Sequence, residues 1–244
     1  MRWAVLSDIH ANGEALNEVE THLARLRTDR ILFLGDAVGY NPDPELCVRR
    51  ISALADASVR GNHDKTVTDP ANLDWFNPVA RQALEWTRRT LSDEGRRLTA
   101  ALPEGPLEVG GRYLLCHGSP IDEDQYLTTT REAEECFRFL ERRHPDVWIC
   151  FFGHTHVPLL VAESLRAVNP PQRTRLDRQV RYLINPGSIG QPRDRVPLAS
   201  FGVLDDEELV YEHYRVAYPI EKTQAKILAA GLAPTLAERL AGGW

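Results

Sequence analysis

Ala57-Ser58-Val59-Arg60-Gly61-Asn62-His63-Asp64 reads as the end of a buried strand followed by a sharp turn and a polar loop. Glycine permits such a turn, so Asn62 and His63 are expected at the tip of a loop between a strand and a helix. Asn62 offers a carbonyl oxygen to a divalent cation, and His63 offers an imidazole that can carry a proton near neutral pH. Taken alone, the string also fits an ordinary Asn-His turn without chemistry.

The start of the chain contains a second unit of the same kind. Residues 2–7 (RWAVLS) are a short apolar run without helical period, which is typical of a buried strand. Asp8 and His10 follow it, and residues two apart on an extended backbone point the same way. Asn12-Gly13 closes this loop, and apolar residues then recur at helical spacing to about residue 28.

A third unit lies between these two. Residues 31–34 are a continuous apolar run, as expected of a strand covered on both faces, and Asp36 stands at its carboxyl end. Residues 41–44 (NPDP) predict a turn and a helix start. Strands alternating with helices indicate an α/β sheet with parallel pairing, whose ligands bind at the carboxyl ends of the strands. The polar residues expected at such ends are Asp8, His10, Asp36, Asn62 and His63.

The middle of the chain adds further histidines at strand ends. Residues 107–116 predict two strands around a Gly-Gly turn, and His117 follows them. A helix is predicted at about 130–143, and the apolar strand 147–152 runs into Gly153-His154-Thr155-His156. A His-x-His pair at a strand end is typical of a metal site. Its coincidence with the Asn-His loop makes a purely structural explanation hard to maintain.

The remaining segments are less informative about chemistry. Residues 65–102 are predicted to be mainly helical; for Trp75 and Phe76 within them, packing is favoured over stacking on a nucleobase. A strand at 181–184, a closing hairpin at 199–203 and 209–216, and outer helices at 220–230 and 233–240 are predicted after them.

Composition restricts the class of protein. A chain of 244 residues with 43% hydrophobic content can bury a full core, and we expect residues 1–244 to form a single domain. Four cysteines without paired spacing, and no signal peptide or membrane-spanning run, predict a reduced cytoplasmic setting without membrane contact. The formal charge of −6 argues against a stable nucleic-acid complex.

Taken in order, these motifs resemble the signature of the calcineurin-like metallophosphoesterases. Within that superfamily the chain is similar to the small single-domain bacterial and archaeal branch, which includes phosphodiesterases and diadenosine tetraphosphate hydrolase-like enzymes. The closer likeness rests on residues 36–42, residues 185–188 and the helical tail after Arg215. The resemblance implies a four-layer αββα sandwich of two mixed sheets flanked by helices; the residues alone indicate an α/β sheet with an antiparallel addition.

The resemblance also implies a dinuclear metal centre. It assigns Asp8, His10, Asp36 and His156 to one metal and Asn62, His117 and His154 to the second, with Asp36 bridging both. Oxygen and imidazole donors without thiolate suit Mn, Fe, Zn or Ni. Two such ions about 3.5–4 Å apart can clamp an in-line displacement and acidify a bridging water, which would then serve as the hydroxide nucleophile.

The expected proton donor is His63, which is not needed as a ligand and can protonate the departing alkoxide. Its alternative role is to orient other groups around the metals. Protein serine/threonine phosphatases of this superfamily carry Asp-Arg-Gly where this chain has Gly39-Tyr40-Asn41. That departure weakens the phosphoprotein phosphatase interpretation and leaves Asp64 as a substitute support for His63.

Because that arginine is missing, other residues have to bind the phosphate. The candidates are Asn12, Asn62, backbone groups near Ser188, and an arginine of the segment 190–195, for which Arg193 is the hypothesis. A solvated surface arginine is the competing interpretation of Arg193.

The predicted function is metal-dependent hydrolysis of phosphate esters of small molecules or nucleotides. A phosphodiesterase or dinucleoside polyphosphate hydrolase is preferred, and a phosphomonoesterase or phosphoprotein phosphatase is the alternative. A non-catalytic scaffold of the same fold is disfavoured, because the chain keeps His63 and every matched ligand. The sequence is compatible with a homo-oligomer.

Overall fold

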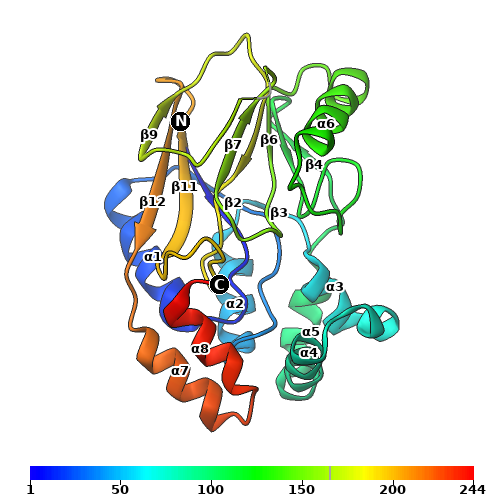
Figure 1. The fold of residues 1–244 in the computed structure, drawn as a ribbon, viewed down its shortest axis with the longest axis vertical. Coiled ribbons are helices and arrows are strands. Elements are labelled where there is room, and N and C mark those ends of the chain that lie inside the picture. The colour runs from blue at the N-terminus through cyan, green and yellow to red at the C-terminus, as the bar shows by residue number, and fades with distance from the viewer. Residues whose placement is uncertain (165) are drawn as a thin grey trace.

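The computed structural model describes residues 1–164 and 166–244, and two six-stranded sheets form its centre (Figure 1). The first sheet has the strand order β3 (Ala57–Ser58), β2 (Arg30–Phe33), β1 (Arg2–Leu6), β11 (Ala199–Asp205), β12 (Val210–Val216) and β9 (Arg173–Arg175). The second has the order β4 (Leu107–Val109), β5 (Tyr113–Leu115), β6 (Ile149–Phe151), β10 (Tyr182–Asn185), β7 (Leu159–Ala162) and β8 (Ala167–Val168).

Both sheets are mixed. In the first sheet β1, β2 and β3 are parallel to one another, while β11 pairs antiparallel with β1 and with β12. In the second sheet β5, β6 and β10 are parallel, and β4 and β7 join them antiparallel. Each sheet therefore presents the carboxyl ends of three parallel strands, where ligands of α/β proteins bind.

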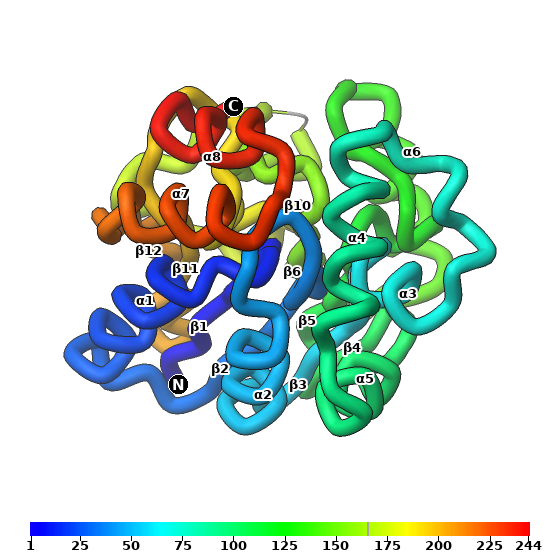
Figure 2. The backbone as a smooth tube through the Cα atoms, turned by 90° about the horizontal axis from the view of Figure 1, so that it is seen from below, coloured from blue at the N-terminus to red at the C-terminus, as the bar shows by residue number. Residues whose placement is uncertain are grey.

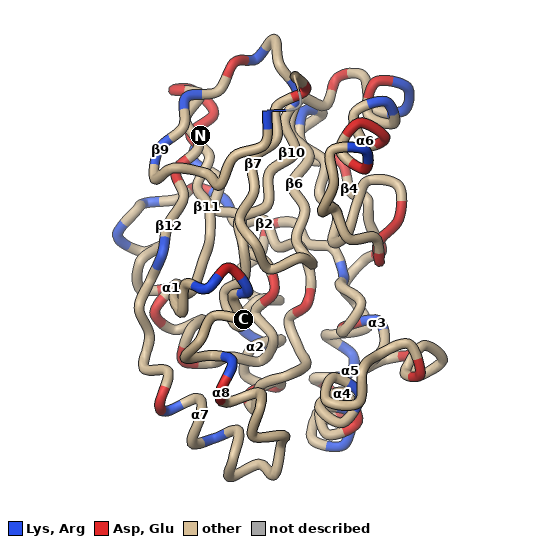
Figure 3. Tube along the Cα trace, viewed as in Figure 1, with Lys and Arg blue, Asp and Glu red and all other residues tan. Residues whose placement is uncertain are grey.

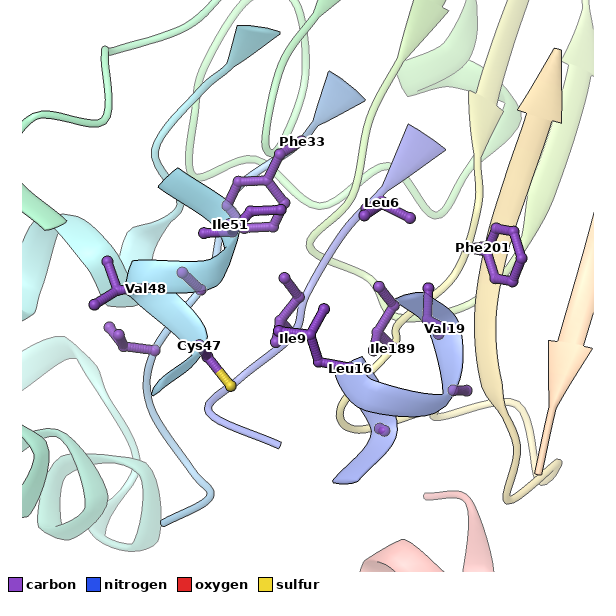
Figure 4. Close-up of a cluster of buried hydrophobic side chains, with 14 of the residues drawn as sticks. Leu6, Ile9, Leu16, Val19, Phe33, Cys47, Val48, Ile51, Ile189 and Phe201 are labelled. Atoms are coloured by element: carbon purple, nitrogen blue, oxygen red, sulfur yellow. The ribbon is translucent and has the colours of Figure 1, made fainter. Parts of the chain in front are cut away.

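The apolar residues of the strands belong to three hydrophobic clusters, one between the two sheets and one on the outer face of each sheet. Val5 of β1 and Phe151 of β6 belong to the core between the two sheets, whereas Ala4 and Leu6 face the opposite side of the first sheet. There they pack against helices α1 (Gly13–Leu26) and α2 (Pro44–Leu54), as Figure 4 shows for Leu6, Leu16 and Ile51. On the outer face of the second sheet, α6 (Thr130–Arg143) covers a third cluster. This alternation confirms the predicted four-layer sandwich.

The other helices lie around the ends of the sheets. They are α3 (Asn62–Thr68), the 3-10 helix η1 (Pro70–Trp75), α4 (Pro78–Thr90), α5 (Asp93–Ala100), α7 (Ile220–Ala229) and α8 (Pro234–Gly242). Helices α7 and α8 lie side by side (Figure 2). Their apolar residues form a separate cluster with Ala80 and Ala83 of α4 and with Tyr40. Acidic and basic residues are interspersed along α6 (Figure 3). Across residues 1–164 and 166–244, no helix combines the length and apolarity needed to cross a membrane.

Most predicted elements are present with small shifts of their ends. The hairpin around Gly110-Gly111, helix α6 and the antiparallel pair β11 and β12 are confirmed. The strand expected at 57–59 is a two-residue, half-buried edge strand, because β2 covers it on one side only. Strands β7, β8 and β9 were not predicted, since each is short and lies in a segment without a strong alternating pattern.

Gly61 has a different role from the expected one. Its backbone is extended, with φ −102° and ψ 176°, so the chain needs no special glycine conformation there. A Cβ atom at Gly61 would instead lie 2.1 Å from Asp36 Oδ1. The glycine is therefore required for space beside Asp36 rather than for a turn.

Candidate metal centre

Loops from both sheets bring the predicted ligands to one place. Asp8 and His10 follow β1, Asp36 follows β2, His117 follows β5, and the His-x-His pair follows β6. Two groups result, and in each the potential ligand atoms lie within 4.8 Å of one another. The first group is Asp8, His10, Asp36 and His156, and the second is Asp36, His117 and His154.

Asp36 occupies the position between the two groups. Its Oδ2 atom lies 3.4 Å from His10 Nε2 on one side and 3.4 Å from His117 Nε2 on the other. Its Oδ1 atom accepts a hydrogen bond of 2.9 Å from the backbone N–H of His63. A carboxylate placed in this way can belong to both groups at once, as the sequence predicts for a bridging ligand.

Hydrogen bonds to the backbone determine which ring nitrogen of each histidine faces the site. The contacts are His10 Nδ1 to Val38 O (3.1 Å), His117 Nδ1 to Leu34 O (2.8 Å) and His156 Nδ1 to Gln191 O (2.6 Å). A carbonyl oxygen only accepts, so in each case Nδ1 carries the proton and the Nε2 lone pair points inward. Such outer contacts commonly orient metal-binding histidines.

His154 uses its two nitrogens the other way round. Its Nε2 atom is 3.1 Å from the carbonyl oxygen of Asp124, which leaves Nδ1 as the inward acceptor. That Nδ1 lies 3.1 Å from His117 Nε2, and His117 Nε2 in turn lies 3.1 Å from Asn62 Oδ1. Three acceptor atoms from different elements therefore converge on one point.

The same convergence occurs in the first group. His10 Nε2 and His156 Nε2 are 3.0 Å apart, although both present lone pairs. Asp8 Oδ2 accepts hydrogen bonds from Ser7 Oγ and from the backbone of His154, but Asp8 Oδ1 is buried without a partner. Buried acceptors facing one another are unfavourable unless positive charge lies between them. The donor set therefore fits divalent cations in both groups.

The electrostatics of the cluster agree with this assignment. Burial lowers the pKa of His154 to about 3 and holds the pKa values of His10 and His156 well below their usual range, so these imidazoles are neutral, as metal ligands must be. Burial also raises the pKa of Asp8 to about 7. Although burial alone would lower the pKa of His117, Asp36 and Asp8 raise it to about 10, which shows how strongly these carboxylates attract positive charge.

Several candidate ligands adopt a strained backbone. Their φ angles are 53° at Asp8, 48° at His10, 60° at Asp36, 65° at His154 and 59° at His156. Left-handed conformations are uncommon outside glycine and cluster at functional sites, where the surrounding structure maintains them. Here the backbone N–H groups of Asp8 and His10 donate to the carbonyls of Gly35 and Asp36 at 3.0 and 2.9 Å.

His63 is positioned by packing instead of by hydrogen bonds. Its ring lies 4.4 Å from that of Tyr40, 4.7 Å from that of His10 and 5.1 Å from that of Phe76. Its Nδ1 atom is buried without a partner and faces Gly39, where a Cβ atom would approach it to 2.2 Å. Burial lowers the pKa of His63 to about 4. The Nε2 edge is the one left for the adjoining cavity, which His63 lines.

Asp64 does not support His63, contrary to the possibility raised by the sequence. Its two carboxylate oxygens accept hydrogen bonds from backbone N–H groups only. The donors are Asp36 (2.7 Å), Ala37 (2.9 Å), Val38 (3.3 Å) and Gly61 (3.0 Å). Because these bonds occupy both oxygens, Asp64 holds the loop that carries Asp36 and does not hydrogen-bond to the imidazole of His63.

An open cavity with an accessible volume of about 220 Å³ adjoins the cluster. Its walls include Asp36, Asn62, His63 and Arg193. Arg193 donates from Nη2 to Tyr40 Oη at 3.3 Å and to Gln191 Oε1 at 3.2 Å, and its guanidinium lies 5.8 Å from the centre of the Tyr40 ring. The segment 190–195 thus delivers an arginine to the cavity, as the sequence predicts, and Arg193 is not a solvated surface residue.

Asn12 lies elsewhere. It is fully buried and caps α1, with Oδ1 accepting from the backbone N–H of Ala15 and Nδ2 donating to the carbonyl of Gly190. Thr223 Oγ1 donates to the same Oδ1. Its amide is therefore used inside the protein, and the predicted phosphate contact at Asn12 is wrong.

Three further aromatic residues, Trp75, Phe76 and Tyr126, line the cavity. Trp75 is 78% exposed, so the packing expected of it is wrong, whereas Phe76 does pack and is half-buried against the core. Tyr126 lies in the loop after β5, and its ring packs against that of His154 at a tilt of 42°, with ring centres 3.9 Å apart. No motif surrounds Tyr126, so only its position in space identifies it.

Comparisons with known proteins agree on one family. The pattern of the calcineurin-like phosphoesterase superfamily domain matches residues 1–208. An uncharacterised protein of Methanocaldococcus jannaschii is 35% identical over 97% of this chain and 96% of its own. A crystal structure of a metallophosphoesterase from Sphaerobacter thermophilus is 39% identical, with a TM-score of 0.88 over 100% of this chain and 99% of that one. A hypothetical protein of Pyrococcus horikoshii, 21% identical, shares the fold with a TM-score of 0.81 over 100% and 98% of the two chains.

Proposed function

The chain belongs to the calcineurin-like phosphoesterase superfamily, and from that premise we propose that it hydrolyses phosphate diesters or dinucleoside polyphosphates with two divalent transition-metal ions. The observation that carries the proposal is the convergence of unprotonated ring nitrogens and carboxylate oxygens on two neighbouring points that share Asp36. The chain would act as one catalytic domain.

The ligands are proposed as the family resemblance assigns them. Asp8, His10, Asp36 and His156 would hold one ion, and Asp36, Asn62, His117 and His154 the other; Mn, Fe, Zn and Ni are the candidate metals. A bound pair of such ions supplies Lewis-acid activation of water and of the phosphoryl group. The protein's part is to point one ring nitrogen of each of the four histidines inward, by hydrogen bonds of the other ring nitrogen to backbone carbonyls.

His63 is proposed to supply a proton to the leaving oxygen from Nε2. The imidazole lines the cavity beside Asp36, and its packing against Tyr40 and Phe76 keeps the ring in one orientation. Burial favours the neutral ring, whereas the negative charge of Asp36 favours the protonated one. An anionic phosphate entering the cavity acts in the same direction as Asp36, so substrate binding promotes the protonated form that can act as an acid.

Arg193 and Asn62 are proposed to hold the phosphate. The guanidinium supplies positive charge and several N–H donors at the cavity wall, which suits non-bridging phosphate oxygens. Arg193 contacts Tyr40, which belongs to the segment Gly39-Tyr40-Asn41 that lacks the arginine of the serine/threonine phosphatases.

The preference for diesters over monoesters rests on the cavity. It extends from the metal cluster past His63 to η1 and to the loop containing Tyr126, well beyond the space that one phosphate group needs. A substrate with organic groups on both sides of the phosphorus fits that arrangement.

The test compares substrates and metals in one series. Demetallated protein would be reloaded with Mn, Fe, Zn or Ni and assayed on bis(p-nitrophenyl) phosphate, p-nitrophenyl phosphate and diadenosine tetraphosphate. Asp36→Asn should abolish turnover with every metal, while Asp93→Asn, a change at a side chain that is 94% exposed, should leave turnover unchanged.

Three results would contradict the proposal. Full activity without metal, or an Asp36→Asn variant as fast as the parent, would remove the dinuclear centre from the reaction. Dominant turnover of p-nitrophenyl phosphate would replace the diesterase by a monoesterase. Silence on every substrate with metal bound would favour a non-catalytic scaffold.

A further inference from the structure

Trp75 is the most exposed of the large apolar side chains of the described residues, at 78%. Single exposed apolar residues are common on protein surfaces and need no explanation by themselves. Trp75 differs because its side chain lines the cavity that also contains Asp36, His63 and Arg193. The exposed indole therefore faces the place where the substrate is proposed to bind.

The segment that carries Trp75 is well anchored. Asp69 accepts a hydrogen bond from the backbone of Ala71 at the start of η1, and Asp74 pairs with Arg81 of α4 at 2.6 Å. The next residue, Phe76, packs edge-on against His63 with ring centres 5.1 Å apart. Although η1 projects from the body of the molecule (Figure 1), these contacts fix Trp75 relative to the proposed proton donor.

The cavity changes character along its length. The cluster around Asp36 and the guanidinium of Arg193 suit an anionic phosphate, whereas the wall formed by η1 and its neighbour α4 presents Trp75 together with the uncharged Asn72 and Asn77. An aromatic face beside amide groups suits a flat heterocycle with hydrogen-bonding edges. The two ends together match a molecule that joins a phosphate to such a ring.

We infer that Trp75 is a stacking platform for a nucleobase of the substrate and that it makes the enzyme prefer nucleotide esters over simple alkyl or aryl ones. The inference rests on the proposed function and narrows its substrate class. Trp75 acts in binding and in specificity; the metals, His63 and Arg193 would treat a nucleotide ester and a simple ester alike.

The experiment uses two diesters with the same leaving group. Thymidine 5′-(p-nitrophenyl phosphate) carries a base, and methyl p-nitrophenyl phosphate does not; the measured quantity is the ratio of their kcat/KM values with the metal-loaded protein. Trp75→Ala should lower that ratio by roughly 5- to 150-fold, the range that base stacking on an aromatic side chain spans. Trp75→Phe should largely keep the parent's ratio of kcat/KM values, and Trp75→Leu should lower that ratio as Trp75→Ala does.

The series separates stacking from other effects. Leu keeps apolar bulk without an aromatic face, and Leu228→Ala, which shortens an apolar side chain that is 55% exposed on α7, is the matched surface control. A Trp75→Ala variant that loses equal activity on both diesters, or a Trp75→Leu variant as selective as the parent, would overturn the inference. Such results would leave the proposed function intact.

A binding measurement covers the case in which the enzyme does not turn over either diester, which would count against the proposed function alone. Adenosine 5′-monophosphate should quench tryptophan fluorescence of the parent and of Trp244→Phe, a control that removes another exposed indole, but not of Trp75→Phe. Equal quenching in Trp75→Phe and the parent would overturn the inference independently of catalysis.

Discussion

His63 is a buried histidine whose orientation depends on its neighbours' shapes. Gly39 leaves room for Nδ1, the Tyr40 ring lies against the imidazole, and Asn41 donates from Nδ2 to the backbone carbonyl of His10 at 2.8 Å. The segment Gly39-Tyr40-Asn41 therefore holds the loop and the ring by packing and backbone bonds. This explains how the chain positions His63 without the aspartate of the related serine/threonine phosphatases.

Removing the imidazole of His63 tests its role as a proton donor. We expect His63→Ala to bind both metals but to lower kcat by about 10²- to 10⁴-fold, the usual contribution of general acid catalysis. The loss should grow as the leaving group becomes more basic, because such groups need the proton most. Metal analysis and kcat over a series of aryl and alkyl diesters measure the two effects.

The control for that variant is His22→Ala on α1, where the ring hydrogen-bonds with the carbonyl of Glu18 on the same helix. It should retain the parent's activity. Undiminished turnover of alkyl diesters by His63→Ala would exclude the proposed role.

Arg193 is tested through substrate affinity. Charge-assisted hydrogen bonds contribute about 1.5–3 kcal/mol, so Arg193→Ala should raise KM by roughly tenfold or more while kcat changes less. Arg193→Lys should recover part of the affinity, since lysine keeps the charge but not the fork of donors. Arg195→Ala, two residues along the same segment and exposed, is the matched control and should leave KM unchanged. An unaltered KM in Arg193→Ala would remove the residue from phosphate binding.

At the scale of the structural elements, hydrogen bonds between different strand–loop–helix units join the loops after β1, β2 and β3. Asp64 in the first turn of α3 accepts hydrogen bonds from the backbone of residues 36–38, in the loop after β2. That loop in turn contacts the one after β1, since His10 and Ala11 donate to the carbonyls of Asp36 and Ala37. The candidate ligands are therefore held by a continuous set of backbone bonds across three elements.

Replacing Asp64 should weaken this set of bonds. In Asp64→Asn one acceptor oxygen becomes an N–H₂ donor facing backbone donors, and each buried donor left unpaired costs about 1–3 kcal/mol. We expect the free energy of unfolding to fall by about 2–4 kcal/mol. Burial raises the pKa of Asp64 to about 7, so urea unfolding should be measured near pH 8, where the parent's carboxylate is ionised.

Asp69→Asn provides the comparison for Asp64→Asn. Asp69 also accepts a backbone N–H, that of Ala71, but at an exposed turn where water replaces a lost bond. Asp69→Asn should lower the free energy of unfolding by well under 1 kcal/mol. Equal decreases in the free energy of unfolding in the two variants would show that the backbone hydrogen bonds of Asp64 contribute no more to stability than that of Asp69.

For the molecule as a whole, the two sheets share an apolar core and also share the proposed metal ligands. Asp8, His10 and Asp36 come from the first sheet, and His117, His154 and His156 from the second. Cations bound between them would hold the sheets together at one end, because ligands that bind only the native state stabilise it. The opposite faces of both sheets are covered by α1, α2 and α6.

His213, which belongs to neither group of candidate ligands, predicts how the stability of the whole protein responds to acid. The ring on β12 is 7% exposed, and its Nε2 atom lies 2.8 Å from Ser200 Oγ. Burial, with a smaller contribution from Arg215 and against the opposing effect of Asp194, lowers the pKa of His213 to about 4. The unfolded chain has a histidine pKa of about 6.5, so the unfolded state binds the proton more readily.

The sign of the effect follows from that difference. Stability from neutral His213 is fully present above pH about 6.5 and is lost as the pH falls toward 4, by up to about 3 kcal/mol. His213→Gln should remove this dependence, so the difference in unfolding free energy between variant and parent should change between pH 7 and 4. Denaturant titrations at several pH values measure it; a constant difference would show that His213 does not titrate on unfolding.

The sequence by itself determined the strand–loop–helix units, the order of the ligand motifs and hence the family. These features are local: apolar runs of strand length, helical periodicity, and Asp, Asn and His directly after strands appear within a few residues of one another. The resemblance then implied the four-layer fold, which the two mixed sheets confirm. The clustering of Asp8, His10 and Asp36 was predictable because parallel strands place their carboxyl ends at one edge of a sheet. The resemblance, and not the strand pattern, implied that His117, His154 and His156 from the second sheet join them.

Only the tertiary structure decided the features that depend on distant segments meeting. Asn12 caps α1 through the nearby N–H of Ala15, but its amide is also bound by Gly190 and Thr223 from distant segments, and Asp64 binds backbone N–H groups of the loop after β2. Trp75 is exposed because no later segment covers η1 within the described chain, whereas Phe76 beside it packs against His63. A side chain's partners over such separations in sequence are set by packing between elements, and local patterns carry no record of that packing.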